Sequence, residues 1–150
     1  MRKSIVMTGL ILICLASSSM GQNDSDANKI LGKWLTAEEK GRVKIYQCNG
    51  DEYCGKIVWT KNNAQGKPPK FDENNPDPDK RDRKILGLTI LKGLEYNADE
   101  EIWEGGKIYD PNKGKKYNCY VELVNPDKLK LRGYIGFSMI GRSSYWTRIH

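Results

Sequence analysis

The feature that most constrains the fold of this chain is a succession of short segments in which apolar and polar residues alternate. The clearest of these segments are residues 42–48, 54–60, 116–124 and 128–134, and Gly- or Pro-containing turns separate them. Alternation with a period of two is typical of a strand with one buried face. Shorter strands are expected at 30–36, 88–92, 101–104, 107–110 and 142–149. The sequence therefore predicts an all-β fold, an antiparallel meander of about eight strands, and closure into a barrel would leave no exposed edge.

The N-terminus has the three-part pattern of an export signal. Arg2 and Lys3 precede an apolar run at 5–15, and the small residues Ser19 and Gly21 follow it. An apolar run of this length is too short for a membrane-spanning helix, which needs roughly 20 residues. We therefore expect a Sec signal peptide at 1–21, cleaved after export to the periplasm or the medium, and no transmembrane segment.

The remainder is long enough for one domain only. We expect a flexible polar lead-in at 22–29 and a single β-barrel domain at 30–150. The formal net charge of +6 arises from Lys and Arg that are interspersed with Asp and Glu. Because nucleic-acid binding requires basic residues gathered on one face, this distribution argues against a nucleic-acid partner.

The cysteines are consistent with export to an oxidising compartment. Cys14 lies in the predicted leader, whereas Cys48 and Cys54 flank five residues between two expected strands. Residues opposed across a hairpin come within disulfide reach, so we expect a Cys48–Cys54 bridge. Cys119 alternates with apolar residues and is expected to be a buried free thiol.

One segment, Asn62–Arg83, interrupts the series of strands. It contains four prolines together with many Asp and Asn residues, and proline excludes a central strand. An oxygen-rich loop of this kind suits calcium, which takes six to eight oxygen ligands, but its spacing is not that of an EF-hand. We expect a structured lid beside the mouth of the barrel, with cation binding as the alternative.

Five short sequence blocks follow one another along the chain. They are Cys48-x5-Cys54-Gly55-Lys56-Ile57-Val58-Trp59, Asn75-Pro76-Asp77-Pro78, Gly87-Leu88-x-Ile90-Leu91, Gly106-Lys107-Ile108-Tyr109-Asp110-Pro111 and Gly141-Arg142-x3-Trp146-Thr147-Arg148. In order and spacing they resemble an uncharacterised family of small exported bacterial proteins, described only as a domain of unknown function. The resemblance implies a lipocalin-like barrel of the calycin type, with an interior that holds a small apolar molecule. It implies no activity and no catalytic residues.

Gly32-Lys33-Trp34 matches the G-x-W motif on the first strand of lipocalins. In that fold the Trp closes one end of the barrel and an Arg of the last strand packs across it. Arg142 and Arg148 both lie in the last expected strand, and either is a candidate for a cation–π contact with Trp34. The alternative is that Trp34 is simply a core aromatic.

Aromatic residues are spread over nearly every expected strand. Trp59, Trp103, Tyr109 and Tyr117 are the candidates for the barrel interior. Aromatics with a polar tip suit a pocket that holds an apolar body and hydrogen-bonds one end of it. The alternative is that they only fill the core, because eight strands enclose either packed side chains or one small ligand.

Catalysis finds little support in the sequence. The single histidine, His150, is the last residue, so neither a nucleophile–histidine pair nor a zinc site is expected. We expect no enzyme, no catalytic or metal-binding residues and no cofactor. The predicted function is binding of a small amphipathic or lipid-like molecule by an exported barrel. The alternative is an envelope interaction module that docks a protein or polysaccharide through its loops.

Overall fold

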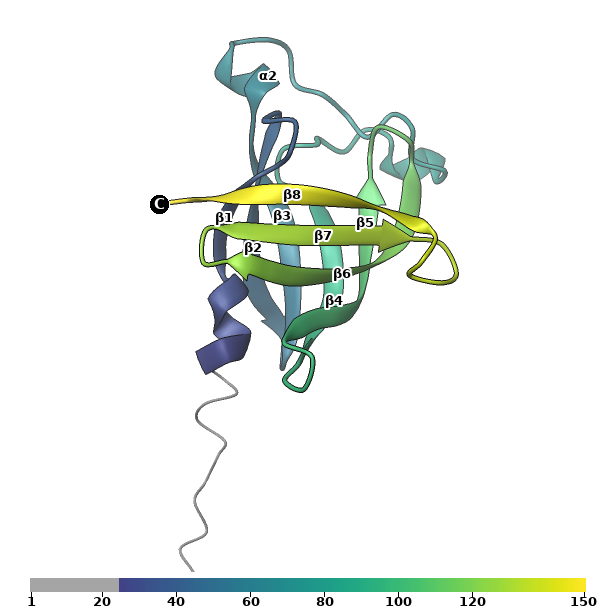
Figure 1. The fold of residues 1–150 in the computed structure, drawn as a ribbon. Helices are drawn as coiled ribbons and strands as arrows, with labels where there is room; N and C mark the ends of the chain where they lie inside the picture. Colours follow the sequence, from purple (N-terminus) through teal and green to yellow (C-terminus); the bar gives the residue numbers. More distant parts are fainter. Residues whose placement is uncertain (1–24) are drawn as a thin grey trace, which may run out of the picture.

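The computed structural model describes residues 25–150, which form a closed eight-stranded barrel (Figure 1). The predicted signal peptide at 1–21 and its cleavage site lie outside the described residues. The strands are β1 (Gly32–Leu35), β2 (Gly41–Asn49), β3 (Glu52–Thr60), β4 (Thr89–Asn97), β5 (Ile102–Asp110), β6 (Lys115–Asn125), β7 (Lys128–Tyr134) and β8 (Gly141–Ile149). Short helical turns occur at η1 (Asn28–Ile30), α2 (Lys61–Ala64) and η2 (Pro78–Lys80).

Each strand pairs antiparallel with the next strand in the chain, and β1 pairs with β8 to close the barrel. The predicted fold class, an all-β antiparallel meander closed into a barrel, is confirmed. The strands expected separately at 101–104 and 107–110 form one strand, β5. Gly105 lies between them with a φ of 72° and forms a bulge opposite β6, so the residue that resembled a turn bends the strand without ending it.

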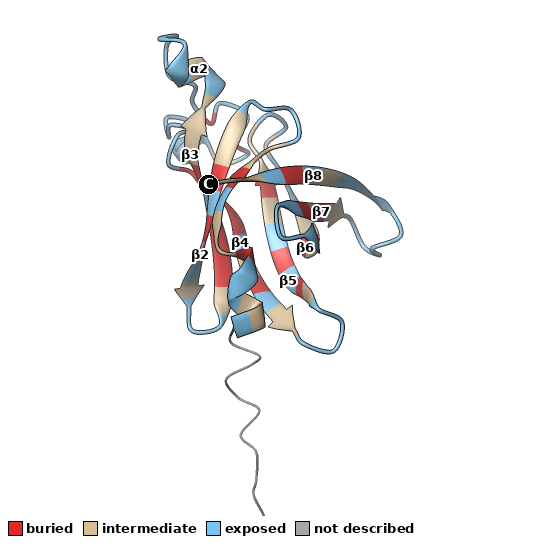
Figure 2. Cartoon of the chain, turned by 60° about the vertical axis from the view of Figure 1, so that its left-hand side comes forward, coloured by how far each residue is buried: buried red, intermediate tan, exposed pale blue. Residues whose placement is uncertain are grey.

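Buried and exposed residues alternate along much of the strands (Figure 2). Because successive side chains of a strand point to opposite faces, the buried ones line the barrel interior. Close packing requires small residues at some inner positions. A Cβ atom on Gly106 would lie 2.6 Å from Leu94 Cδ2, so the glycine makes room for the leucine. The largest fully buried apolar side chains are Trp34, Trp103, Ile30, Ile45, Leu91, Leu94, Leu129, Val43 and Val121.

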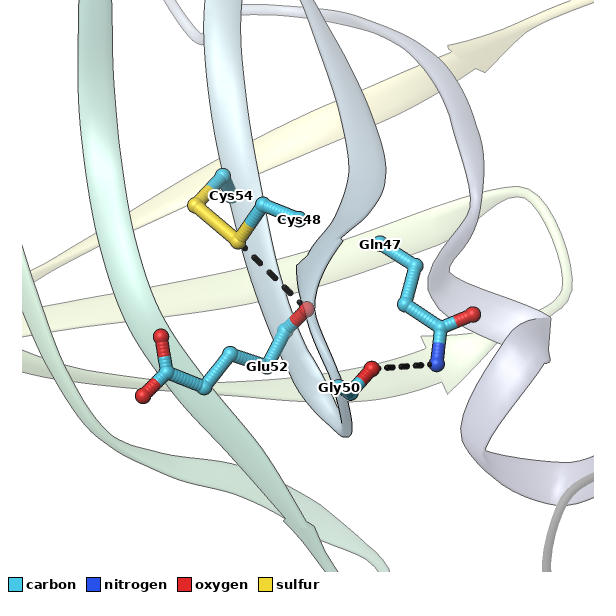
Figure 3. Close-up of a disulfide and its surroundings, with 5 residues drawn as sticks. All are labelled: Gln47, Cys48, Gly50, Glu52 and Cys54. Carbon is cyan, nitrogen blue, oxygen red and sulfur yellow. Dashed lines mark hydrogen bonds between the residues drawn. A yellow bond between two sulfur atoms is a disulfide. The ribbon is translucent and has the colours of Figure 1, made fainter.

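The β2–β3 hairpin carries the predicted disulfide between Cys48 and Cys54, which is confirmed (Figure 3). The Cα atoms of the two cysteines are 5.8 Å apart. At the tip of the hairpin, Gln47 Nε2 donates a hydrogen bond to the carbonyl oxygen of Gly50, at 2.7 Å. The bridge therefore clips the hairpin next to its turn.

Cys119, on β6, is a fully buried free cysteine. Burial raises the pKa of its thiol to about 12. A thiol that stays protonated is a poor nucleophile, so Cys119 acts here as a small core residue.

Candidate ligand-binding site

Trp34 of β1, the predicted barrel-end plug, lies at the end of the barrel that the N-terminal turns contact, called the closed end below. Its side chain is fully buried, and Nε1 donates a hydrogen bond to the carbonyl oxygen of Ile30 at 2.9 Å. The Arg148 guanidinium carbon lies 4.1 Å from the centroid of the indole ring. Trp34 and Arg148 are register partners in the pairing of β1 with β8, which closes the barrel.

Arg148 also binds three backbone carbonyl groups around that end. Its Nη2 and Nη1 donate to the carbonyl oxygens of Lys29 and Leu31, at 2.6 and 2.7 Å, and Nε donates to Pro126 at 2.7 Å. Of the two candidate arginines, the structure thus brings Arg148 to Trp34. Arg142 lies at the opposite end of β8, where its register partner is Gly133.

The N-terminal turns cover the same end. Trp103, only 2% exposed, donates from Nε1 to the carbonyl oxygen of Ala27 at 3.0 Å, and Tyr53 donates from its hydroxyl to Asn28 Oδ1 at 3.0 Å. The segment expected to be a flexible lead-in is therefore helical at residues 25–30 and hydrogen-bonded to the barrel. The donors that hold this segment are the indole N–H of Trp103 and the hydroxyl of Tyr53. Both residues are distant in sequence, so the polar composition of the segment does not reveal the contact.

The other end of the barrel holds a cavity of about 620 Å³. Ile108 and Tyr117 are register partners across β5 and β6, and Leu91, next to Ile108 on β4, lies on the same inner face. The apolar part of the wall is Ile90, Ile108, Tyr117, Leu131, Ile135 and Ile140. Gly133, which has no side chain, leaves part of this space open.

A second cavity of about 890 Å³ adjoins the first. The two have Ile90, Ile108, Tyr109, Tyr117 and Ile135 in common, so they overlap. The second wall carries more basic than acidic residues. Its carboxylates are Glu52 and Asp77, and its cationic residues are Lys80, Arg83, Lys92, Lys107, Lys115 and Lys116. Two of these cations are neutralised, because Lys80 pairs with Asp77 and Arg83 with Asp72.

Two cations lie at the open end, beside the first cavity. Arg142 and Lys113 line the first cavity together with a single carboxylate, Asp110. Within residues 25–150 neither Arg142 nor Lys113 has an ion-pair or hydrogen-bond partner on its side chain. These two cations are free to meet an anion that enters the mouth.

Tyr109 lines both cavities, and its hydroxyl group contacts the long β3–β4 connection. Its hydroxyl donates to Asp72 Oδ1 at 2.6 Å and accepts a hydrogen bond from Asn75 Nδ2 at 3.1 Å. Asn75 Nδ2 also donates to Asp72 Oδ2 at 2.7 Å, and Arg83 Nη2 pairs with the same oxygen at 2.9 Å. These four residues attach the connection to β5.

Burial and hydrogen bonding act in opposite directions on this group. Burial alone would raise the pKa of Asp72, but hydrogen bonds from Tyr109, Asn75 and Arg83 outweigh it and lower that pKa. For Tyr109 both effects agree, because burial and the neighbouring Asp72 carboxylate raise its pKa to about 12. Asp72 is thus a buried carboxylate with every hydrogen bond directed within the protein.

The four predicted interior aromatics divide between the two faces of the barrel. Trp103 and Tyr117 lie on the inner face, the first at the closed end and the second in the cavity wall. Tyr109 lies under the connection, and half-buried Trp59 lies on the outer face, where the Arg42 guanidinium carbon is 4.5 Å from its ring centroid. The structure thus places Trp59 beside Arg42, apart from the other three aromatics. An irregularity in the β2–β3 register, between Arg42 and Val43, moves the ring to the other face.

The long connection remains a predicted lid. In residues 25–150 there is no group of three or more His, Cys, Asp or Glu side chains placed to hold a metal ion. Asn74 Nδ2 donates to the carbonyl oxygen of Asn112 at 3.0 Å, so the connection also contacts the β5–β6 hairpin beside the mouth.

Residues 32–148 match the model of a family described as "Uncharacterized protein conserved in bacteria (DUF2147)". The chain belongs to the DUF2147 family. Among solved structures it is similar to protein HP1028 from the human pathogen Helicobacter pylori, which is described as belonging to the lipocalin family.

The likeness to the Helicobacter protein has a TM-score of 0.69 at 23% sequence identity, and it covers 81% of this chain and 83% of that one. At this identity the likeness shows the lipocalin-like fold of this DUF2147 protein. No match was found among curated proteins. Within the described residues, no helix is long and apolar enough to cross a membrane.

Sequence reasoning missed two parts of the site. The first is the set of Asp72, Asn75, Arg83 and Tyr109, which joins residues from a loop and a strand far apart in sequence. The second is the apolar residues of 135–140 at the mouth. A signal for the second was present, because a Gly-containing turn rarely carries so many large apolar side chains.

Proposed function

We propose that this DUF2147 protein is an exported binder of a small amphipathic molecule with an acidic head group. The observation that carries the proposal is an apolar cavity whose rim bears Arg142 and Lys113, two cations with no partner in the described structure. Its volume of about 620 Å³ falls within the range of small-molecule sites, which is roughly 300–1,000 Å³.

The layout of the cavity suggests how such a molecule would be oriented. Ile108, Leu131 and Ile90 offer apolar contact to a hydrocarbon body inside the barrel. A carboxylate, sulfate or phosphate on the same molecule would then lie at the rim, near Arg142 and Lys113, where a charge keeps part of its hydration. Burial of the body supplies most of the affinity, and the charged contact fixes the direction of entry.

Export is part of the proposal. The leader at 1–21 supports it from the sequence, and the Cys48–Cys54 bridge fits an oxidising compartment. The experiment that tests the binding function is native mass spectrometry of the protein purified from its own source. A retained small molecule that carries an acidic group supports the proposal, and its release on unfolding gives its mass.

A cavity-blocking variant makes the test specific. A Cβ atom on Gly133 would have ordinary contacts of 3.7 Å with Ile108 and Tyr117, so Gly133→Leu should be accommodated while its side chain occupies the cavity. Gly41→Leu is the matched control. A Cβ atom there also has an ordinary contact, 3.7 Å from the Trp59 carbonyl oxygen, and Gly41 lines neither cavity.

Titration with an anionic fluorescent probe, anilinonaphthalene sulfonate, compares the two variants. We expect Gly133→Leu to lower the affinity by at least about 10-fold and Gly41→Leu to leave it unchanged, because only the first removes apolar contact area from the ligand. Equal affinity of both variants would show that the probe binds elsewhere and would contradict the proposed site.

A further inference from the structure

The loop between β7 and β8 presents large apolar side chains to solvent. Phe137 is 79% exposed and Met139 is 86% exposed, and Ile135 and Ile140 beside them are each more than two-thirds exposed. The loop projects from the barrel in both views (Figures 1 and 2). Since exposed apolar patches in water-soluble domains mark interaction sites, this loop needs a partner.

The loop divides into two pairs of side chains with different surroundings. Ile135 and Ile140 line the cavity, so part of their surface belongs to the ligand site. Phe137 and Met139 line neither of the two cavities at the mouth. The most exposed apolar pair is therefore not explained by binding of a small molecule.

The loop is held in this conformation by Arg132 of β7. Its Nε and Nη2 donate to the carbonyl oxygens of Ser138 and Met139, at 2.6 and 3.1 Å, and Nη1 donates to Ser143 Oγ at 3.1 Å. These bonds satisfy backbone groups of the loop while its apolar side chains face outward. The guanidinium group also places a positive charge at the base of the loop.

Further cations lie at the same end of the barrel as the loop. Arg142 follows the loop in sequence, and Lys113 of the β5–β6 hairpin lines the same cavity as Ile135 and Ile140. Lys115 and Lys116 begin β6 next to that hairpin. Residues 134–141 contain no acidic side chain, and Asp110 is the one carboxylate in the wall of the first cavity. An apolar tip within a basic rim is the pattern of a surface that inserts into an anionic bilayer.

We propose that the β7–β8 loop docks the open end of the barrel onto a membrane surface that contains anionic lipid, with Phe137 and Met139 inserted among the acyl chains. A second copy of this chain is a less suitable partner, because symmetric contact through the loop would bring two basic rims together. The proposal does not depend on a ligand in the cavity. It goes beyond the proposed function by naming the surface that the mouth of the barrel faces.

Vesicle flotation tests the proposal with protein produced from its full sequence, its processing state checked by intact mass. The vesicles are equal parts phosphatidylglycerol and phosphatidylcholine, or phosphatidylcholine alone. We expect the protein to float with the anionic vesicles, at least about 10-fold more than with the neutral ones, and to be released as salt screens the charges.

The variant Phe137→Ser/Met139→Ser should lower binding to anionic vesicles by at least about 10-fold, since it removes the inserted apolar groups. The matched control is Val124→Ser/Tyr145→Ser, which changes two apolar residues, 51% and 47% exposed, outside the loop. We expect the control to bind as wild type. Thermal melting of each variant shows that the barrel is folded.

Several outcomes would overturn the proposal. Absence of flotation, or equal flotation of wild type and the loop variant, excludes insertion of this loop. Self-association of wild type without vesicles, lost in the loop variant, assigns the loop to a second copy. Probe binding measured without vesicles separates the two proposals: we expect the loop variant to keep it, and its loss in Gly133→Leu bears on the cavity alone.

Discussion

The two ends of the barrel are built on opposite principles. At the closed end the polar groups of Trp34, Trp103 and Arg148 each have a hydrogen-bond partner, and the N-terminal turns cover them. At the open end Arg142 and Lys113 have no partner among the described residues, and the loop that carries Phe137 is exposed. The closed end is therefore internally satisfied, whereas the open end leaves charges and apolar surface exposed.

Arg148 and Arg142 show this contrast on one strand. Both lie on β8, and residues of the same parity in a strand share a face. At about 3.3 Å per residue, their separation of six residues places the two Cα atoms roughly 20 Å apart. One guanidinium group stacks on an indole and binds three carbonyl groups, while the other lines a cavity. Location within the barrel, and not residue type, decides what each arginine does.

The largest effect is expected at the closed end. Trp34→Ala should lower the free energy of unfolding by about 3–5 kcal/mol, because it removes a fully buried indole that surrounding residues cannot replace. Chemical denaturation measures the change, with Trp59→Ala as control, since that ring is only half-buried on the outer face. Equal losses of stability for the two variants would contradict the role of Trp34 as a barrel-end plug.

Arg148→Ala should cost less, about 2 kcal/mol, through loss of its stacking on Trp34 and of three hydrogen bonds at an end that is partly open to solvent. Because the two side chains touch, their losses should be non-additive by at least about 0.5 kcal/mol in a double-mutant cycle. Purely additive losses would mean that Trp34 and Arg148 stabilise the end independently, against the plug that the G-x-W motif predicts.

The β3–β4 connection is held by buried hydrogen bonds, like those of the closed end, although it lies beside the open end. The pH dependence of stability tests one of these bonds, from Tyr109 to Asp72. Folding raises the pKa of Tyr109 to about 12, so above pH 10 the folded protein keeps a proton that the unfolded chain releases. This contribution to stability is complete below pH 10 and is lost as the pH rises toward 12. Between pH 8 and 11 wild type should lose about 1.4 kcal/mol more than Tyr109→Phe.

Urea unfolding at each pH measures that difference, and other titrating groups, Cys119 included, cancel in the comparison. Parallel curves for wild type and Tyr109→Phe would show that the Tyr109 hydroxyl is not held as the contact with Asp72 indicates.

The sequence was sufficient for the fold because strand alternation and turn residues are local signals. The hairpin position of Cys48 and Cys54 made the disulfide predictable in the same way. The faces of Trp59 and Tyr109 were not predictable. An irregular register between β2 and β3 displaces the first ring, and the second is covered by Asp72, which lies 37 positions away in sequence.

The choice between Arg142 and Arg148 also depends on long-range structure, because the β1–β8 register decides which of them meets Trp34. Cavities are still less predictable. Ile108 and Leu131 face open space partly because Gly133 has no side chain to fill it. The space also depends on the relative stagger of β5, β6 and β7, which local sequence does not reveal.

The smallest effect on stability is expected at Arg142, and it tests the contrast between the two ends most directly. Arg142→Ala removes an exposed guanidinium group with no ion pair among residues 25–150, so the free energy of unfolding should change by less than about 0.5 kcal/mol. Affinity for the anionic probe should nevertheless fall by about 5- to 10-fold, because one charge-assisted contact is lost. Arg142→Lys should restore part of that affinity, whereas a neutral probe of the same shape should bind all three proteins equally. Arg148→Ala should show the reverse pattern, with a large loss of stability and little change in affinity. If Arg142→Ala instead destabilises the barrel as Arg148→Ala does, both ends are structural, and the acidic head group of the proposed ligand loses its support.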